Sequence, residues 1–185
     1  LKKDSKIEDF LCSLLLQREV NSLKKAKEFF RPDINSLHDP FLMKDMKKIV
    51  KKIEDSREER IMILGDYDVD GTTSTAMLYT YFKNINYDVL YYIPDRYNEG
   101  YGVSEKAIDY AEKNKVSLII TVDCGIKAIN QVRISNSKNI EMIICDHHLP
   151  GDQIPNAFGI LNPKQKKCKY PFKDLCGCGI AYKLI

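Results

Sequence analysis

The sequence lacks the features of secreted and membrane proteins. It contains no apolar stretch of membrane-spanning length and no segment with the pattern of a secretory signal. The longest apolar runs, such as residues 116–122, have the length of a strand and are interrupted by polar residues. We therefore expect a cytoplasmic protein that makes no contact with a membrane.

The cysteines form neither a disulfide framework nor a recognisable zinc motif. None of the six has a partner at C-x-x-C spacing, and a chain of 185 residues without a secretion signal has little need of disulfides. Cys168, Cys176 and Cys178 combine C-x-C spacing with a remote third thiol, which is a poor arrangement for zinc. We expect reduced thiols that bind no metal.

Charge of one sign is not in large excess. The 29 basic and 26 acidic residues give a formal net charge of +3, which does not by itself indicate a polyanionic partner. Lysines nevertheless cluster in "MKKIVKKIE" (46–54) and "KQKKCK" (164–169). We interpret these runs first as solvated faces, with nucleic-acid contact as the alternative.

The sequence changes character near residue 60, which divides it into two predicted domains. Residues 1–59 have apolar residues at three- and four-residue spacing, which predicts a helical N-terminal extension. In residues 60–185 short apolar runs alternate with amphipathic segments, which is typical of α/β proteins with a mostly parallel, Rossmann-like sheet and flanking helices. The predicted strands are 61–64, 88–93, 117–122, 141–145 and 158–162; the predicted helices are 73–83, 104–115, one after Gly125 and one beginning in "CGCGIAYKLI".

The stretch "LGDYDVDGTTST" (64–75) is neither a calcium loop nor a phosphate-binding loop. A calcium hand needs an incoming helix and a Glu at its twelfth position, whereas a strand enters here and the twelfth residue from Asp66 is Met77. A phosphate-binding loop needs a Lys after its second glycine, but Thr72 follows Gly71. The aspartates of this stretch need another explanation.

Aspartates and histidines follow three of the predicted strands. Asp66, Asp68 and Asp70 occupy alternate positions and converge if the extended backbone continues through them. Two later strands run directly into Asp123 and into "DHH" at 146–148. Ligands of open α/β sheets bind at the carboxyl ends of the strands, so these groups should meet. Their oxygen-rich chemistry with imidazoles suits two Mn²⁺ or Mg²⁺ ions, which together promote in-line displacement at phosphorus.

The motifs "DYDVDG", "TVDCG" and "CDHH", in this order and at these intervals, resemble the first three motifs of the DHH phosphoesterases. Within that family the sequence is most similar to the bacterial exonucleases that degrade single-stranded DNA from its 5′ end. The stretches that carry this similarity are "LLLQREV", "HDPFLMKDM", "IPDRYNEGYGVS", "LNPKQ" and "GCGIAYKL". The resemblance implies a metal-dependent exonuclease acting in DNA repair and recombination, with other repair or replication proteins as further partners.

The resemblance also implies a role for each motif residue. Asp66 and Asp68 would serve one metal, Asp70 and His147 the other, and Asp123 would bridge the two. His148 would lie near the scissile phosphate, with Asp146 orienting its neighbours. The implied catalytic residues are Asp70, Asp123, His147 and His148.

The loop "PDRYNEGYGVS" (94–104) has side chains suited to substrate binding. Arg96 can hold a phosphate, Tyr97 and Tyr101 can stack on bases, and glycines at 100 and 102 allow close backbone approach. An ordinary connecting loop with Ser104 as a helix N-cap explains the serine and part of the glycines, but not the arginine. The residues predicted to contact substrate are Arg96, Gly100, Tyr101 and His148.

Two other functions share the same motifs. A family phosphodiesterase acting on short oligonucleotides or cyclic dinucleotides usually lacks the helical N-terminal region. A non-catalytic replication scaffold of the same fold usually has degraded acidic motifs, whereas every expected carboxylate and both histidines of the three motifs are intact here. The family's fourth motif, which supplies another metal-binding aspartate, is not in the sequence. We therefore expect the chain to be part of a longer protein and to be weakly active or inactive alone.

Overall fold

The computed structural model of the chain describes residues 8–185, so the part of the predicted helical extension at residues 1–7 lies outside the described residues. The chain forms two compact units, Leu1–His38 and Asp39–Ile185. In the first unit, helices α1 (Asp9–Gln17) and α2 (Leu23–Phe30) precede a short 3₁₀ turn, η1 (Ile34–Ser36). Helix α2 begins where the Ser22 hydroxyl accepts a hydrogen bond from the Lys25 N–H, as expected of an N-cap. Leu15, Val20 and Ala26 form the small core of this unit.

The second unit is built around a five-stranded sheet whose paired strands are all parallel. The strands are β1 (Arg60–Gly65), β2 (Asp88–Tyr92), β3 (Leu118–Val122), β4 (Glu141–Cys145) and β5 (Gly159–Leu161), in the order β2-β1-β3-β4-β5. Every residue of β3 is buried, which explains why that strand appears in the sequence as a continuous apolar run. The predicted α/β fold with a parallel sheet and preceding helices is confirmed.

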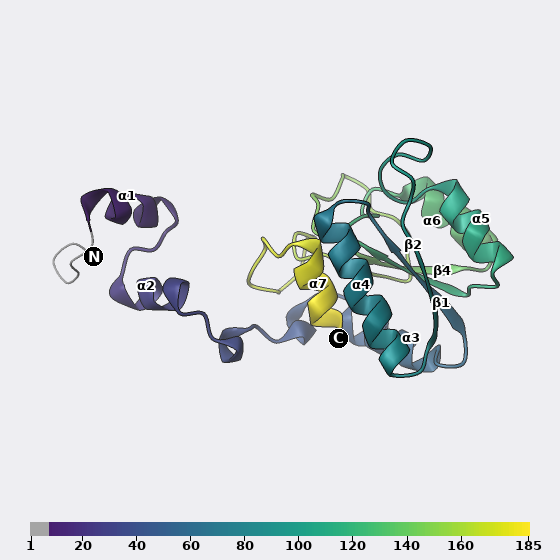
Figure 1. Ribbon diagram of the computed structural model, residues 1–185, viewed down its shortest axis with the longest axis horizontal. Helices are drawn as coiled ribbons and strands as arrows, with labels where there is room; N and C mark the ends of the chain where they lie inside the picture. Colours follow the sequence, from purple (N-terminus) through teal and green to yellow (C-terminus); the bar gives the residue numbers. More distant parts are fainter. Residues whose placement is uncertain (1–7) are drawn as a thin grey trace. The chain divides into compact units, whose positions relative to one another are not determined.

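Helices cover both faces of the sheet (Figure 1). One face packs against α3 (Met46–Asp55), α4 (Val69–Asn84) and α7 (Gly177–Leu184), and the other against α5 (Glu105–Lys113) and α6 (Ile129–Ser137). The 3₁₀ turn η2 (Pro40–Leu42) leads into α3. None of the described helices is both long and apolar enough to cross a membrane.

Helix α3 packs within the sheet unit, although the sequence analysis placed it in the N-terminal extension. Its residues Met46, Ile49 and Ile53 are buried in the core that also contains strands β1 and β3. The change of sequence character near residue 60 marks the first strand, whereas the compact unit begins at Asp39. These compact units do not test where a domain begins, so the predicted domain boundary after residue 59 stays a prediction.

Helix α4 begins at Val69, four residues earlier than the predicted start at residue 73. The Asp68 carboxylate accepts a hydrogen bond from the Gly71 N–H and thereby caps the helix. Asp70 is consequently in the first helical turn, so the expectation that the extended backbone continues through all three aspartates is wrong. A side chain at Gly71 would lie 2.5 Å from the Asp66 carbonyl oxygen, so this early start requires glycine there.

The central strand should contribute strongly to stability. Ile120, in the middle of β3, is fully buried, and Ile120→Ala is expected to lower the free energy of unfolding by about 2–5 kcal/mol because it leaves a cavity. Ile129→Ala removes the same atoms from a side chain that is 40% exposed and should cost clearly less. Urea denaturation of both variants measures the difference, and equal losses would show that β3 is not the centre of the core.

Candidate metal centre

Three neighbouring strands end in register, and an aspartate follows each. Gly65 of β1 pairs with Val122 of β3, which in turn pairs with Cys145 of β4. The next residues, Asp66, Asp123 and Asp146, are therefore brought together at the carboxyl edge of the sheet, and each is only 1% exposed. Such burial is rare for carboxylates unless charges or hydrogen-bond donors compensate it.

Asp66, Asp68 and Asp123 form a first group that could hold a cation. One carboxylate oxygen from each lies within 4.8 Å of the others. Buried oxygens of two members, Asp66 Oδ1 and Asp123 Oδ1, accept no hydrogen bond from any described residue. Acceptors that are buried, negative and without donors fit a divalent cation that prefers oxygen ligands, such as Mn²⁺ or Mg²⁺.

The electrostatics of this group lead to the same conclusion. Burial, followed by the negative charges of Asp70 and Asp68, raises the pKa of Asp123 to about 8. Burial likewise raises the pKa of Asp66, although hydrogen bonds from the Tyr67 and Gly102 backbone partly offset it. A cation among these carboxylates would favour their ionised forms and relieve the repulsion between them.

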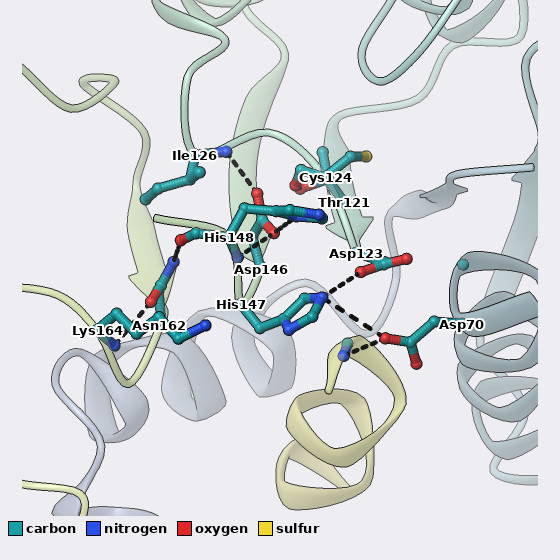
Figure 2. Close-up of polar contacts among 12 residues, drawn as sticks. Asp70, Thr121, Asp123, Cys124, Ile126, Asp146, His147, His148, Asn162 and Lys164 are labelled. Atoms are coloured by element: carbon teal, nitrogen blue, oxygen red, sulfur yellow. Dashed lines mark hydrogen bonds and ion pairs between the residues drawn. The ribbon is translucent and has the colours of Figure 1, made fainter. Parts of the chain in front are cut away.

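Asp123 also belongs to a second group, with His147 and His148 (Figure 2). The His147 Nε2 atom lies 3.1 Å from Asp123 Oδ1, without the alignment of a hydrogen bond, and 3.7 Å from Asp70 Oδ2. Asp123 is thus the residue that the two groups share, as a bridging ligand would be. Of the five predicted ligands, Asp66, Asp68 and Asp123 gather tightly, and Asp70 and His147 lie beside them.

Asp70 is held by the N-terminus of α7. Its carboxylate accepts hydrogen bonds from the Gly177 N–H at 2.5 Å and the Cys178 N–H at 2.7 Å. These are unpaired donors of the first helical turn, where the helix dipole also favours a negative charge. A Cβ atom at Gly177 would lie 2.7 Å from Asp123 Oδ1, so this position also leaves room for the shared carboxylate.

Asp146 differs from its two buried neighbours because its oxygens have donors. Asp146 Oδ2 accepts a hydrogen bond from the Ile126 N–H, and Oδ1 lies 2.7 Å from His148 Nδ1 and accepts from the His148 N–H. The Asn162 side chain in turn donates to the His148 carbonyl oxygen. These contacts, drawn in Figure 2, orient the His148 ring and leave its Nε2 atom free of the carboxylate.

The loop at 94–104 reaches the same edge of the sheet. The Tyr101 hydroxyl donates to the Asp123 carbonyl oxygen and lies 3.3 Å from His148 Nδ1. Burial is the main cause that raises the Tyr101 pKa above its usual range, so the hydroxyl keeps its proton. The Arg96 guanidinium lies over the ring of Tyr67, 5.3 Å from its centroid.

The glycines and the capping residue of this loop have distinct places. Gly100 and Gly102 have φ values of +77° and +85°, and a Cβ atom at Gly100 would meet nothing within 4 Å. Tyr97 is exposed, and its backbone N–H is held by the carboxylate of Asp95. Ser104 caps α5 by accepting from the Ala107 N–H, as predicted.

Sequence reasoning missed the residues that hold these side chains in place. Gly177 and Cys178 were recognised only as part of a helix start, and Asn162 only as part of a similar stretch. Glu99, which no pattern singled out, fixes the 94–104 loop by accepting hydrogen bonds from Tyr92 and Ser104. A glycine at the first position of a predicted helix was the one available signal for the contact between α7 and Asp70.

The six cysteines are reduced, and neither candidate metal group among the described residues contains one. Cys124 and Cys145 are fully buried, and burial raises the pKa of both thiols. Cys176 is exposed at the N-cap of α7, where its Sγ accepts from the Gly179 N–H.

Comparisons with known proteins identify relatives of the whole chain. A protein-family model described as "DHH family, N-terminal domain" matches residues 60–185. The single-stranded-DNA-specific exonuclease RecJ of Bacillus subtilis (strain 168) is 41% identical over 180 residues, which cover 96% of this chain and 23% of that protein. The chain therefore spans about a quarter of the length of this relative.

Solved structures give the same picture. A crystal structure of exonuclease RecJ bound to manganese matches with a TM-score of 0.70 and 31% identity, covering 77% of this chain and 36% of that chain. RecJ from Thermus thermophilus in complex with Mn²⁺ matches with a TM-score of 0.69 and 26% identity, covering 92% of this chain and 23% of that chain.

The close approach at Gly177 leads to a testable expectation. Gly177→Ala should displace the Asp123 carboxylate and weaken Mn²⁺ binding by about tenfold, the usual effect of disturbing a group that orients a ligand. Titration of Mn²⁺ followed by thermal unfolding measures this loss.

Gly179→Ala is the matched control, because the closest atom to its Cβ would be the end of the flexible Leu175 side chain at 3.0 Å, and the next contacts, Leu175 Cβ at 3.6 Å and Cys176 Sγ at 3.7 Å, are ordinary van der Waals distances. Both variants should fold without metal. Unchanged Mn²⁺ affinity in Gly177→Ala would show that the position does not control Asp123.

Proposed function

The chain belongs to the DHH family, and from this premise we propose that it is the metal-binding part of an exonuclease that hydrolyses single-stranded DNA from the 5′ end. The observation that carries the proposal is the pair of candidate metal groups that share Asp123 at the ends of three adjacent strands. The proposed setting is DNA repair and recombination in the bacterial cytoplasm, with other repair or replication proteins as further partners.

The proposed metal ligands are Asp66, Asp68, Asp70, Asp123 and His147. A pair of Mn²⁺ or Mg²⁺ ions bound there would supply the charge that stabilises the attacking and leaving oxygens of an in-line displacement at phosphorus. The residues of the chain would set the positions of the ions: Asp123 belongs to both groups, and α7 holds Asp70 beside His147. The amino acids thus set where a phosphodiester can be bound.

His148 is placed to act on the substrate directly. A hydrogen bond from Nδ1–H to Asp146 leaves Nε2 of the neutral ring as an acceptor. His148 can therefore exchange a proton with a phosphodiester oxygen at the neighbouring metal centre.

Single-stranded DNA is the proposed substrate because of the relatives and of the 94–104 loop. The B. subtilis relative is named for specificity toward single-stranded DNA, and it matches the helical N-terminal region as well as the sheet unit. That extent favours this branch over phosphodiesterases that lack the region. Arg96 would grip a backbone phosphate, Tyr101 would contact a base or sugar, and Gly100 leaves open space for the strand.

The complete protein that carries this sequence provides the direct test. With Mn²⁺, it should release mononucleotides from the 5′ end of single-stranded DNA and leave a blunt duplex of the same sequence largely intact. Degradation from the 3′ end, equal attack on the duplex, or activity only on cyclic dinucleotides would each contradict the proposal.

Metal binding can be tested on the 185-residue chain without hydrolysis. Mn²⁺ should stabilise the wild type by RT ln(1 + [Mn²⁺]/Kd), and Asp123→Asn should lose most of this gain because the shared ligand is removed. Without metal at neutral pH, Asp123→Asn should unfold at a higher temperature than the wild type, because the folded wild type must keep a proton on Asp123, whose pKa is raised to about 8, whereas the unfolded chain releases it; the amide carries no such cost.

Asp55→Asn is the control, because this exposed carboxylate ends α3 away from the candidate groups. It should respond to Mn²⁺ as the wild type does. Equal stabilisation of Asp123→Asn and the wild type would place the ions elsewhere.

The role of Arg96 can be separated from the chemistry. Arg96→Ala in the complete protein should weaken binding of single-stranded DNA and make the slope of log K against log salt less negative by about 0.7, the contribution of one phosphate. Arg96→Lys should recover only part of the affinity, because an ammonium lacks the bidentate fork. Fluorescence anisotropy over a salt series measures both, and Mn²⁺ affinity should not change. Wild-type affinity and slope in Arg96→Ala would make the residue an ordinary loop side chain.

A further inference from the structure

Two lysine-rich segments that are distant in sequence meet in the sheet unit. One runs from Lys44 into helix α3, and the other, residues 164–169, follows β5. The Lys44 ammonium lies 3.3 Å from Gln165 Oε1, and the Asp45 carboxylate accepts a hydrogen bond from the Ile160 N–H. These contacts hold the two segments next to each other.

Most of these lysines have no carboxylate partner. Lys48 pairs with Asp45, and Lys52 with Glu141. The remaining lysines form no ion pair with any described residue, and we call them the lysine face: Lys44, Lys47, Lys51 and the four lysines of 164–169. They carry more positive charge than the chain's formal net charge of +3, so the rest of the chain is net negative.

Two exposed lysines of helix α3 lie close enough to repel each other. Lys47 and Lys51 are one helical turn apart and both are exposed, an arrangement of like charges that weakens an isolated helix. Asp55 lies one further turn along the helix, but neither lysine forms an ion pair with a described residue. The unpaired lysines therefore suggest a polyanionic partner.

The lysine face begins at Lys164, which is linked through Asn162 to the backbone of His148. The buried Asn162 side chain donates to the His148 carbonyl oxygen at 2.9 Å and accepts from the Lys164 N–H at 2.8 Å. Figure 2 shows Asn162 and Lys164 next to His148, on the chain segment that leads into the lysine face. A strand whose phosphate lies at the metal centre can continue onto these lysines.

We propose that the lysine face binds the sugar–phosphate backbone of the DNA strand that is cut at the metal centre. The inference rests on the proposed function for the identity of the strand. Lysine ammonium groups neutralise successive phosphates without reading bases, which suits an enzyme that must accept any sequence. An acidic protein segment would match the charge, but only the strand explains why the face adjoins the metal centre.

The test measures, by fluorescence anisotropy, how a fluorescent oligothymidylate binds to the 185-residue chain. A metal chelator is present so that no DNA is cut. A triple variant, Lys47→Gln, Lys51→Gln and Lys167→Gln, removes three exposed charges from the lysine face. It should bind more weakly, and its slope of log K against log salt should be less negative by about 2, since each phosphate on a single strand contributes about 0.7.

The matched control is Lys83→Gln, Lys113→Gln and Lys115→Gln, which removes equal charge from exposed positions at the end of α4 and at and just after the end of α5. It should retain nearly the wild-type affinity and slope. Equal weakening by both triples, or no change in the lysine-face triple, would overturn the proposal. Competition by poly-glutamate as effective as by DNA would also overturn it and favour an acidic protein partner.

A second measurement separates this inference from the proposed function. In the complete protein, a dinucleotide occupies only the metal centre, so the lysine-face triple should hydrolyse it as the wild type does while degrading long strands with a raised KM. If the triple variant hydrolysed the dinucleotide as slowly as it degrades long strands, the lysine face would not be a binding site separate from the metal centre. Failure of the wild type to cut any DNA would refute the exonuclease instead, and the anisotropy comparison would still decide whether the lysine face binds a strand.

Discussion

The register of three parallel strands is the constraint on which the rest of the site depends. Because β1, β3 and β4 end level with one another, the aspartate after each strand is forced into the same buried place. Ionised carboxylates repel one another and lose their hydration there, so each must be compensated by hydrogen-bond donors, by a cation or by a bound proton. Among the described residues, the neighbouring segments supply hydrogen-bond donors to some of these carboxylate oxygens and leave others without one.

The compensation differs from one aspartate to the next, and the difference separates their roles. Asp146 has backbone and imidazole donors on both oxygens, so it has little capacity left for a metal and instead holds His148. Asp66 and Asp123 each retain a buried oxygen that accepts no hydrogen bond from a described residue, so these oxygens are available to a cation. Asp70 lies between these cases, because the N–H groups of α7 fix its orientation while a carboxylate has further lone pairs to offer.

The sequence was sufficient to predict the parallel α/β fold and the meeting of the three motifs, because strand periodicity and the position of polar residues after apolar runs are local signals. It was not sufficient to place Asp70, since whether the chain stays extended or enters a helix after Asp68 depends on a cap and on the space at Gly71. Contacts between distant segments were also inaccessible. The hydrogen bonds from α7 to Asp70 join residues more than a hundred positions apart, and no periodic pattern records them.

The candidate metal centre is contacted by segments from both layers of helices. Tyr101, from the segment leading to α5, contacts the Asp123 backbone, while Gly177 of α7 approaches the same residue from the opposite layer. Asp123 also has a left-handed backbone, with φ of 60°, which a non-glycine residue adopts only when its surroundings determine it. The shared carboxylate is therefore positioned by contacts from both faces of the sheet, and a displacement of either layer would reach the metal centre through this one residue.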